Sequence, residues 1–215
     1  MPSPSTIRFY VPHGYYHIYN RGVEKRNIFL DTSDYKIFSY YLFIYLSSPD
    51  LVKIVYPDLK IALRNGNFYG RISLLSYALM PNHFHFLLYQ TDTEYITAFM
   101  RRVTNAYTRY FNTKYERVGS LFQGVFKGIQ ADTDNYLLQV SKYIHKNPFI
   151  LQKRQLYVYP WSSYPNYLRL QNSSFVQTDT ILSFFSKTNP SLSYKSFVES
   201  DDEISIPEDF FLETE

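Results

Sequence analysis

The sequence predicts an α+β fold, in which a ferredoxin-like antiparallel sheet of split βαββαβ order is followed by an additional C-terminal helix. Two observations carry this prediction. Segments rich in aromatic and β-branched residues alternate with segments whose apolar residues recur at helical spacing. Their order is strand, helix, strand, strand, helix, strand, helix, and the first six elements match the split βαββαβ pattern.

The first half of this pattern begins at residues 15–20, an aromatic and β-branched segment that we expect to form a strand. Asp31-Thr32-Ser33 supplies N-cap side chains for the first helix. Until Ser48-Pro49, apolar side chains then recur at helical spacing, namely Ile37, Phe38, Tyr41, Leu42, Tyr45 and Leu46. Residues 50–69 fit either an inserted hairpin or a loop, because Arg64-Asn65-Gly66-Asn67 is a turn signal.

The middle of the chain predicts a strand pair and a second helix. Residues 72–79 and 83–89 are expected to form antiparallel strands around the tight turn Met80-Pro81-Asn82. Thr91-x-x-Glu94 has the form of a capping box, which would open the second helix. The apolar stripe of that helix contains Ile96, Met100, Val103, Tyr107 and Tyr110.

The pattern closes with a fourth strand and a last helix. Residues 121–129 are expected to form the strand, Asp132-Thr133-Asp134 to cap the helix, and Asn147-Pro148 to end it. An antiparallel sheet with helices on one face would leave its other face free for a ligand. We therefore expect one domain over residues 1–150, an extension over 151–198 packed on it, and a flexible acidic tail over 199–215.

The charge of the chain is unevenly distributed. It has 22 Lys and Arg and 19 Asp and Glu, but eight of the acids fall in residues 199–215, which contain no Lys or Arg. Residues 1–198 therefore have a net charge of +11. A basic body with 23 tyrosines suits a polyanion with stackable bases, and a generic solubilising basic surface is the alternative. The tail would compete with a polyanion for this surface, unless it only solubilises the chain.

Composition excludes several classes of protein. The absence of cysteine rules out disulfides, thiolate catalysis and cysteine-ligated zinc, and it fits a reducing compartment. No apolar run approaches the roughly 20 residues of a membrane span. Met1-Pro2-Ser3-Pro4-Ser5 lacks the basic and apolar regions of a signal peptide. We therefore expect a cytoplasmic protein without a membrane partner.

The motif His83-Phe84-His85 places two imidazoles two positions apart in an apolar segment. In a strand, residues i and i+2 point to the same face, so both rings would project from one side of the sheet. Such a pair can hold one divalent metal ion. A pair of packed or solvated strand histidines is the alternative.

A second motif is selected from the tyrosines by spacing. In Tyr143-Ile144-His145-Lys146-Asn147, a tyrosine and an amide four positions apart lie about 40° from each other around a helix. His145 would point near the opposite face. Tyr16-x-x-x-Asn20 and Tyr167-x-x-x-Gln171 share the spacing, but the first lies in an expected strand and the second in a weakly patterned segment.

Together the two motifs supply the parts of a phosphoryl-transfer site. Two imidazoles and one amide oxygen form a set of ligands for Mg²⁺ or Mn²⁺, and they leave positions open for a phosphate. These metal ligands are His83, His85 and Asn147. A phenolate at Tyr143 would act as catalytic nucleophile and form a covalent phosphotyrosine. Because free tyrosine has a pKa near ~10, His17 and Lys142 are candidate helpers in its deprotonation, with a sheet histidine and an exposed helix lysine as alternatives.

These motifs, in this order, resemble those of the HUH single-tyrosine transposases, and most of all the REP-associated tyrosine transposases. Three further segments agree with the resemblance: Tyr19-Asn20-Arg21-Gly22, Gly119-Ser120-Leu121-Phe122-Gln123-Gly124-Val125-Phe126-Lys127 and Trp161-Ser162-Ser163-Tyr164. The similarity extends from about residue 14 to residue 168. Each motif alone is weak, and five in the same order are specific.

The resemblance implies that residues 1–150 form an HUH-type nuclease or transposase domain. Such a domain cleaves and rejoins single-stranded DNA near hairpins of repetitive palindromic elements, through a 5′-phosphotyrosine and a free 3′-OH, with Mg²⁺ or Mn²⁺. The resemblance gives His83, His85 and Asn147 the role of metal ligands and Tyr143 that of nucleophile. It also implies association with the nucleoid when DNA is bound, and it leaves both a monomer and a homodimer open. Residues 50–69 and the acidic tail depart from the family pattern.

Basic residues off the apolar stripe or at a strand end are expected to contact phosphates, and a solvated surface is the alternative. They are Arg101, Arg102, Arg109 and Lys127. A non-catalytic single-stranded nucleic-acid-binding module with this sheet is the main functional alternative, although it needs no histidine pair. Leu87 and the lack of repeated His-x-Thr disfavour histidine-triad hydrolases and two-histidine phosphoesterases. A domesticated transposase that acts on chromosomal repeats would differ in genomic neighbourhood rather than in sequence.

Overall fold

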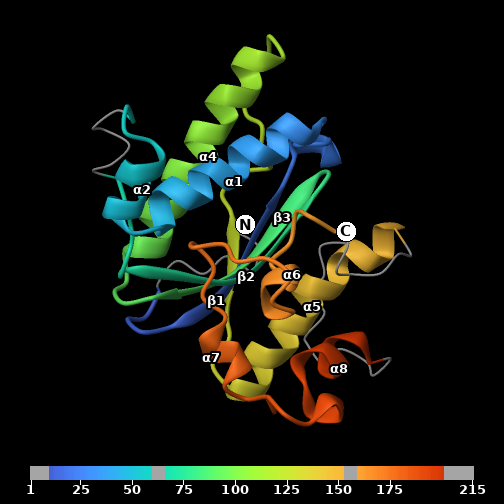
Figure 1. Ribbon diagram of the computed structural model, residues 1–215. Coiled ribbons are helices and arrows are strands. Elements are labelled where there is room, and N and C mark those ends of the chain that lie inside the picture. Colours follow the sequence, from blue (N-terminus) through green and yellow to red (C-terminus); the bar gives the residue numbers. More distant parts are fainter. Residues whose placement is uncertain (1–9, 60–65, 153–158, 201–215) are drawn as a thin grey trace.

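The computed structural model describes residues 10–59, 66–152 and 159–200 of the 215-residue chain. A four-stranded antiparallel sheet lies between two layers of helices (Figure 1). Its strands follow the spatial order β2-β3-β1-β4. They are β1 (Tyr15–Arg21), β2 (Ile72–Met80), β3 (His83–Gln90) and β4 (Lys127–Gln130). This order is that of the split βαββαβ arrangement, so the predicted fold class is confirmed.

The first helical layer consists of α1 (Thr32–Leu46) and α4 (Tyr95–Lys114), with the short α2 (Pro49–Val55) beside them (Figure 1). The side chain of Asp31 caps α1 and accepts hydrogen bonds from the backbone of Ser33 and Asp34, as its motif predicted. Both long helices pack on one face of the sheet. The core between them includes Tyr16, Ile18, Phe38, Leu42, Phe84, Phe86, Leu88, Phe99, Val103 and Tyr107.

The second helical layer covers the opposite face of the sheet. It consists of α5 (Asp134–Gln152), α6 (Tyr164–Tyr167), α7 (Asp179–Leu182) and α8 (Tyr194–Glu199). A second core lies here and includes Leu75, Ala78, Met80, Leu87, Leu137, Val140, Tyr143 and Ile144. The expectation of a free sheet face is therefore wrong, because β2 and β3 carry apolar side chains on both faces and both faces need cover.

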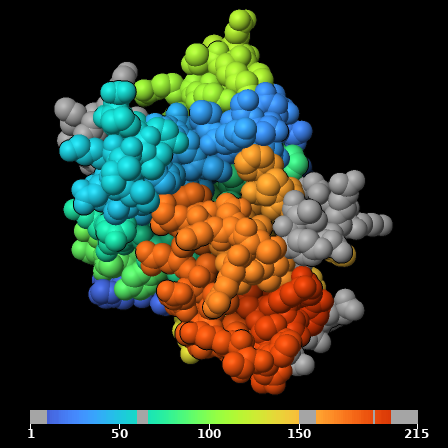
Figure 2. Space-filling view, viewed as in Figure 1, coloured from blue at the N-terminus to red at the C-terminus, as the bar shows by residue number. Residues whose placement is uncertain are grey.

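Residues 159–200 form an outer part of this layer. Figure 2 shows them, in orange and red, spread over one side of the molecule, so that little of the yellow α5 is visible. Residues 161–163 also run beside the edge strand β2: the N–H of Leu79 donates to the carbonyl of Trp161 at 2.8 Å, and the N–H of Ser163 to that of Tyr77 at 3.0 Å. This pairing covers a strand edge that would otherwise be exposed.

The start of α4 differs from the predicted capping box. Glu94 is the N-cap residue but makes no side-chain capping hydrogen bond, and Thr91 Oγ1 donates to the carbonyl of Arg71 at 3.4 Å. Gln90 Oε1 instead accepts a hydrogen bond from the N–H of Ile96 at 3.0 Å. A side chain at the end of β3 therefore satisfies the helix N-terminus.

Three other predictions of secondary structure are corrected. Residues 49–55 form the helix α2, whose N-cap Ser48 accepts a hydrogen bond from the N–H of Leu51 at 3.3 Å. The fourth strand is confined to Lys127–Gln130. The helix α5 continues past Pro148 to Gln152, although a proline cannot donate the hydrogen bond of a helix interior. Two 3₁₀ turns complete the described elements, η1 (Val23–Lys25) and η3 (Pro190–Leu192).

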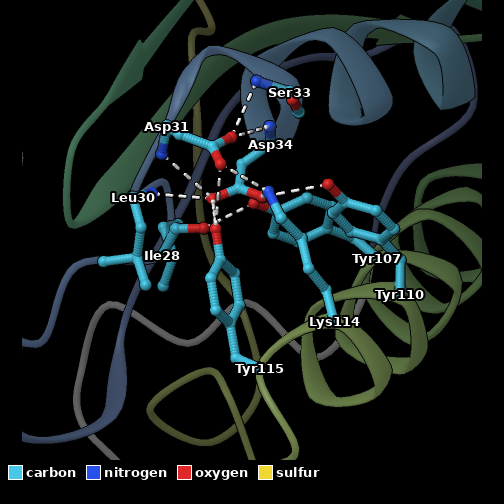
Figure 3. A network of polar contacts seen from close by, with 9 residues as sticks. All are labelled: Ile28, Leu30, Asp31, Ser33, Asp34, Tyr107, Tyr110, Lys114 and Tyr115. Carbon is cyan, nitrogen blue, oxygen red and sulfur yellow. Dashed lines mark hydrogen bonds and ion pairs between the residues drawn. The ribbon is translucent and has the colours of Figure 1, made fainter.

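A buried polar cluster ties the N-terminus of α1 to the C-terminal end of α4 (Figure 3). The side chain of Asp34 is fully buried and accepts hydrogen bonds from the N–H of Leu30 at 2.7 Å and the hydroxyl of Tyr115 at 2.8 Å. Lys114 Nζ lies 2.8 Å from Asp34 Oδ1 and 2.7 Å from Asp31 Oδ2. We call these five residues the Asp34 cluster.

Within the described ranges, no helix is long and apolar enough to span a membrane.

Candidate active site

The candidate site lies where α5 crosses the histidine-bearing face of the sheet. Strand alternation places His17 of β1 on the same face as His83 and His85 of β3, since Tyr19 pairs with His85 and lies two positions from His17. The helix α5 then brings Tyr143 and Asn147 onto this face, because residues four apart lie one above the other on a helix.

His83 is oriented by its neighbours. Its Nδ1 lies 2.7 Å from Asn82 Oδ1, and the amide of Asn82 is itself oriented because its Nδ2 donates to the carbonyl of Lys25 at 3.3 Å. His83 Nδ1 therefore carries the proton, and Nε2 presents a lone pair. That lone pair faces Asn147 Oδ1 at 3.3 Å, which is another acceptor. Two acceptors that face each other indicate a cation between them. The alternative is that the amide of Asn147 is flipped, so that its nitrogen faces His83.

His85 also presents an unused nitrogen. Its Nδ1 lies 2.9 Å from His17 Nε2, while its buried Nε2 has no hydrogen-bond partner among the described residues. The same is true of Asn147 Nδ2. A buried polar atom without a partner costs roughly 1–3 kcal/mol, so such atoms in a folded protein point to an absent ion, water or ligand.

All three histidines are held in the neutral form. Burial lowers the pKa of His83 to about 4, and the positive charge of Arg21 acts in the same direction. Burial lowers the pKa of His17 to about 3. Burial also holds the pKa of His85 well below its ordinary value, and His83 and His17 add to this effect. Neutral imidazole is the form that binds a metal ion.

Tyr143 lies directly against these rings. Its side chain is only 3% exposed, and its ring meets those of His17 and His85 edge to face, with centroid distances of 5.8 and 5.3 Å. His145 points to the other side of α5, as its spacing predicted. Its Nδ1 lies 2.6 Å from the hydroxyl of Tyr194 and its Nε2 2.7 Å from Ser163 Oγ, so it links α5 to α8 and to the start of α6 within the second helical layer.

The structure places the predicted helper and DNA-contact residues on different sides. Lys142 is 1% exposed and its Nζ donates to Ser200 Oγ at 2.8 Å, so it is not the exposed helix lysine of the alternative. Lys127 shares a row with Tyr19 and His85 on the site's face. The exposed arginines lie on α4, across the sheet from the histidines: Arg101, Arg102 and Arg109.

Sequence reasoning missed Arg21. This residue pairs with His83 in the register of β1 and β3, on the same face, and its Nε donates to Gln123 Oε1 at 2.6 Å. The N–H of Gln123 donates in turn to the carbonyl of Arg21 at 2.8 Å, which fastens the loop before β4 to the site. The signal was present, because Arg21 continues the alternation of His17 and Tyr19.

The donor set depends on the amide of Asn147. Over the described residues, no group of three or more His, Cys, Asp or Glu side chains is placed to hold a metal ion. The set of two neutral imidazoles and one amide oxygen nevertheless suits a hard divalent cation that keeps open positions for oxygen ligands. The orphaned Nε2 of His85 and the facing acceptors of His83 and Asn147 are the observations that fit such an ion.

Two comparisons with known proteins find similar sequences or structures. Residues 52–147 match the family described as IS200-like transposases. A solved structure of a REP-associated tyrosine transposase bound to a REP hairpin is similar over 90% of this chain and 97% of that one, with a TM-score of 0.53 and 14% identity, which shows the shared fold. No curated protein sequence matches the chain significantly.

Proposed function

We propose, from the confirmed resemblance of this chain to the HUH single-tyrosine transposases, that it cleaves and rejoins single-stranded DNA near hairpins. One observation carries this proposal. A tyrosine and an amide, one turn apart on α5, meet two strand histidines on a single face of the sheet: Tyr143 lies against His85, and Asn147 faces His83. The hairpin bound to the similar solved structure supports the choice of DNA partner.

The metal ion in this proposal is Mg²⁺ or Mn²⁺, held by His83, His85 and Asn147. When bound, it would polarise a phosphodiester oxygen and offset the charge of the transition state. The protein supplies only neutral donors, so the ion would keep its full charge for the phosphate. Asn82 holds the ring of His83 with its Nε2 lone pair presented to the ion.

Tyr143 supplies the covalent chemistry. Its phenolic oxygen loses a proton and attacks phosphorus, the bond from phosphorus to the 3′ oxygen breaks, and the leaving oxygen takes up a proton to become a free 3′-OH. The DNA is then joined to the protein as a 5′-phosphotyrosine. When the 3′-OH of another strand attacks this linkage, the DNA is rejoined and the tyrosine is regenerated. The bond energy is conserved throughout, so no external energy source is required.

Basic side chains on the site's face would hold the strand. Arg21 and Lys127 lie in adjacent rows beside His83 and His85, where they would contact phosphates next to the scissile bond. The arginines of α4 would contact DNA away from that bond. Tyr143, His83, His85 and Asn147 come together within a single chain.

The decisive experiment is adduct formation. Single-stranded DNA that contains a hairpin from the neighbourhood of the gene is incubated with the full chain and Mn²⁺. We expect a covalent protein–DNA species that mass spectrometry maps to Tyr143. Tyr143→Phe keeps the ring and removes one oxygen, so it should fold normally and form no adduct. EDTA should abolish the adduct formed by the wild-type chain.

Two outcomes would contradict the proposal. An adduct on Tyr136 or Tyr167 would move the nucleophile elsewhere. Hairpin binding without any adduct, over a range of hairpins and with no retention of Mn²⁺, would favour the non-catalytic nucleic-acid-binding module instead.

A further inference from the structure

His17 is the one fully buried histidine of the site that the proposed chemistry does not yet use. Its Nε2 lies 2.9 Å from His85 Nδ1, and the two rings stack with centroids 5.1 Å apart and an interplanar angle of 19°. Both side chains are 0% exposed. The sequence predicted that His17 helps to deprotonate the tyrosine, but its Nε2 instead faces His85, a proposed metal ligand.

We propose that His17 is a positioning residue: it accepts the proton of His85 Nδ1 and so keeps the lone pair of His85 Nε2 available for the metal ion. This inference rests on the metal site of the proposed function and assigns the residue that prepares it. A metal-binding histidine commonly donates its second ring N–H to a carboxylate or carbonyl. Here a neutral imidazole takes that place.

The tautomer follows from counting protons. A hydrogen bond between two neutral imidazoles contains one proton, which belongs either to His85 Nδ1 or to His17 Nε2. In the second case His85 Nε2 would carry a buried N–H, and among the described residues no acceptor is within reach. In the first case His17 carries its own proton on Nδ1, which likewise makes no hydrogen bond among the described residues, and His85 Nε2 is a bare lone pair, which a cation satisfies. Only the first arrangement is compatible with a bound ion.

The environment keeps His17 in the role of acceptor. Its side chain is 0% exposed, so the neutral ring is favoured there, and a neutral imidazole has one lone pair to offer. Its ring is fixed on three sides: it stacks on His85, it lies 4.9 Å from the ring of Tyr19, and Tyr143 meets it edge to face. The orientation of His85 therefore does not depend on a mobile side chain.

A neutral orienting group has a chemical consequence. A carboxylate in the same place would tighten metal binding through its charge, but it would also reduce the net positive charge that a phosphate meets. With imidazole at this position, the site would bind its ion more weakly and attract the DNA backbone more strongly. His17→Asp should therefore bind Mn²⁺ more tightly and single-stranded DNA less tightly than the wild-type chain.

The test measures Mn²⁺ binding and tautomers with the full chain, without any DNA. Free Mn²⁺ is followed by electron paramagnetic resonance in the wild type, His17→Phe, His17→Gln and His145→Gln. We expect His17→Phe to weaken binding about 10–100-fold, as loss of an outer partner does. His17→Gln retains an acceptor and should recover most of the affinity. His145→Gln changes an equally buried histidine outside the site and should alter the affinity less than about twofold.

Nitrogen-15 spectra of the metal-free chain give the second measurement. We expect His85 to carry its proton on Nδ1 in the wild type and in His17→Gln. If wild-type His85 carries it on Nε2, or if a folded His17→Phe binds Mn²⁺ as tightly as the wild type, the role of His17 is refuted. If the wild type itself fails to bind Mn²⁺, the proposed metal site fails instead. If His17→Phe does not fold, the wild-type tautomer and the His17→Gln affinity still decide the question.

Discussion

Two buried polar clusters in this molecule have opposite hydrogen-bonding states. In the Asp34 cluster, a fully buried carboxylate receives hydrogen bonds from Leu30, Tyr115 and Lys114, and also from Tyr110 at 3.0 Å (Figure 3). At the histidine site, His85 Nε2 and Asn147 Nδ2 are equally buried but lack partners within the described chain. Burial is the same in both places, and only the supply of partners differs.

The difference teaches what each cluster contributes. A charged group surrounded by donors costs little to bury, and it links α1 to α4 in a defined geometry. Unpartnered nitrogens cost free energy in the ligand-free state, and a ligand that satisfies them recovers that cost as binding free energy. The first cluster therefore stabilises the fold, and the second is arranged for something that the fold does not itself contain.

The largest expected effect is on cleavage, from His83→Ala. Because even outer-shell changes weaken metal sites roughly 10–100-fold, we expect loss of a direct ligand to reduce Mn²⁺-dependent adduct formation at least about 100-fold. Hairpin binding should persist, since phosphate and base contacts lie elsewhere. Adduct yield and hairpin affinity are measured on the same preparation. Unchanged cleavage in this variant would remove the distinction between the two clusters.

The reciprocal change is Asp34→Ala. Loss of the buried carboxylate leaves the donors of Tyr115 and Lys114 without their acceptor, and we expect the free energy of unfolding to fall by about 3 kcal/mol. Urea denaturation measures this loss. Adduct formation per folded molecule should match the wild type, because the cluster lies across the sheet from Tyr143. A stability loss from His83→Ala that equals or exceeds it would contradict the comparison.

The clusters should also respond to different pH ranges. Burial lowers the pKa of His17 and His145 to about 3 and that of His83 to about 4, whereas unfolded histidine titrates near ~6.5. Below that pH the unfolded chain binds protons first, so the free energy of unfolding should fall as pH drops from about 6.5 towards 4. His145→Gln should reduce this slope.

Asp34 acts at lower pH. Burial alone would raise its pKa, but hydrogen bonds from Lys114, Leu30 and Tyr115 outweigh burial and hold the pKa below its ordinary value. The stability it provides is therefore present above about pH 4 and is lost as pH falls through its folded pKa. Asp34→Asn should remove only this low-pH dependence. An effect of Asp34→Asn on the slope between pH 5 and 6.5 would show that the two ranges are not separate.

The smallest expected effects concern the basic surfaces on the two sides of the sheet. Neutralising Arg101, Arg102 or Arg109 should weaken hairpin binding across sequences and lower the salt slope by roughly one for each phosphate that is no longer neutralised. The yield of adduct per bound DNA should stay constant for these variants. Arg21→Gln should instead lower that yield. An unchanged salt dependence in the triple arginine variant would assign the α4 residues to a solvated surface.

The sequence predicted those parts of the site that follow from local periodicity. Alternation in a strand placed His83 and His85 on one face, and helical spacing aligned Tyr143 with Asn147, because both rules depend only on backbone geometry. The partners of these residues depend on packing between distant segments. The contact of His17 with His85 requires the pairing of β1 and β3, and the cap that Gln90 gives α4 requires the end of β3 to lie beside that helix.

Tertiary packing also explains the wrong predictions. Thr91 and Glu94 have the spacing of a capping box, but the carbonyl of Arg71 engages the threonine and the helix begins after Glu94. The free sheet face was expected from topology alone. It is covered because α5 and residues 159–200 fold back over it, which no local pattern specifies.

The placement of Tyr143 and Asn147 on one helix has a mechanical consequence. The two side chains are one turn apart on α5, so they cannot be displaced independently while that turn stays helical. A rotation or slide of α5 against the sheet would withdraw the phenol from His85 and the amide from His83 together. The position of α5 therefore determines the positions of both the attacking phenol and the third metal ligand, so that one movement of this helix would switch off both together.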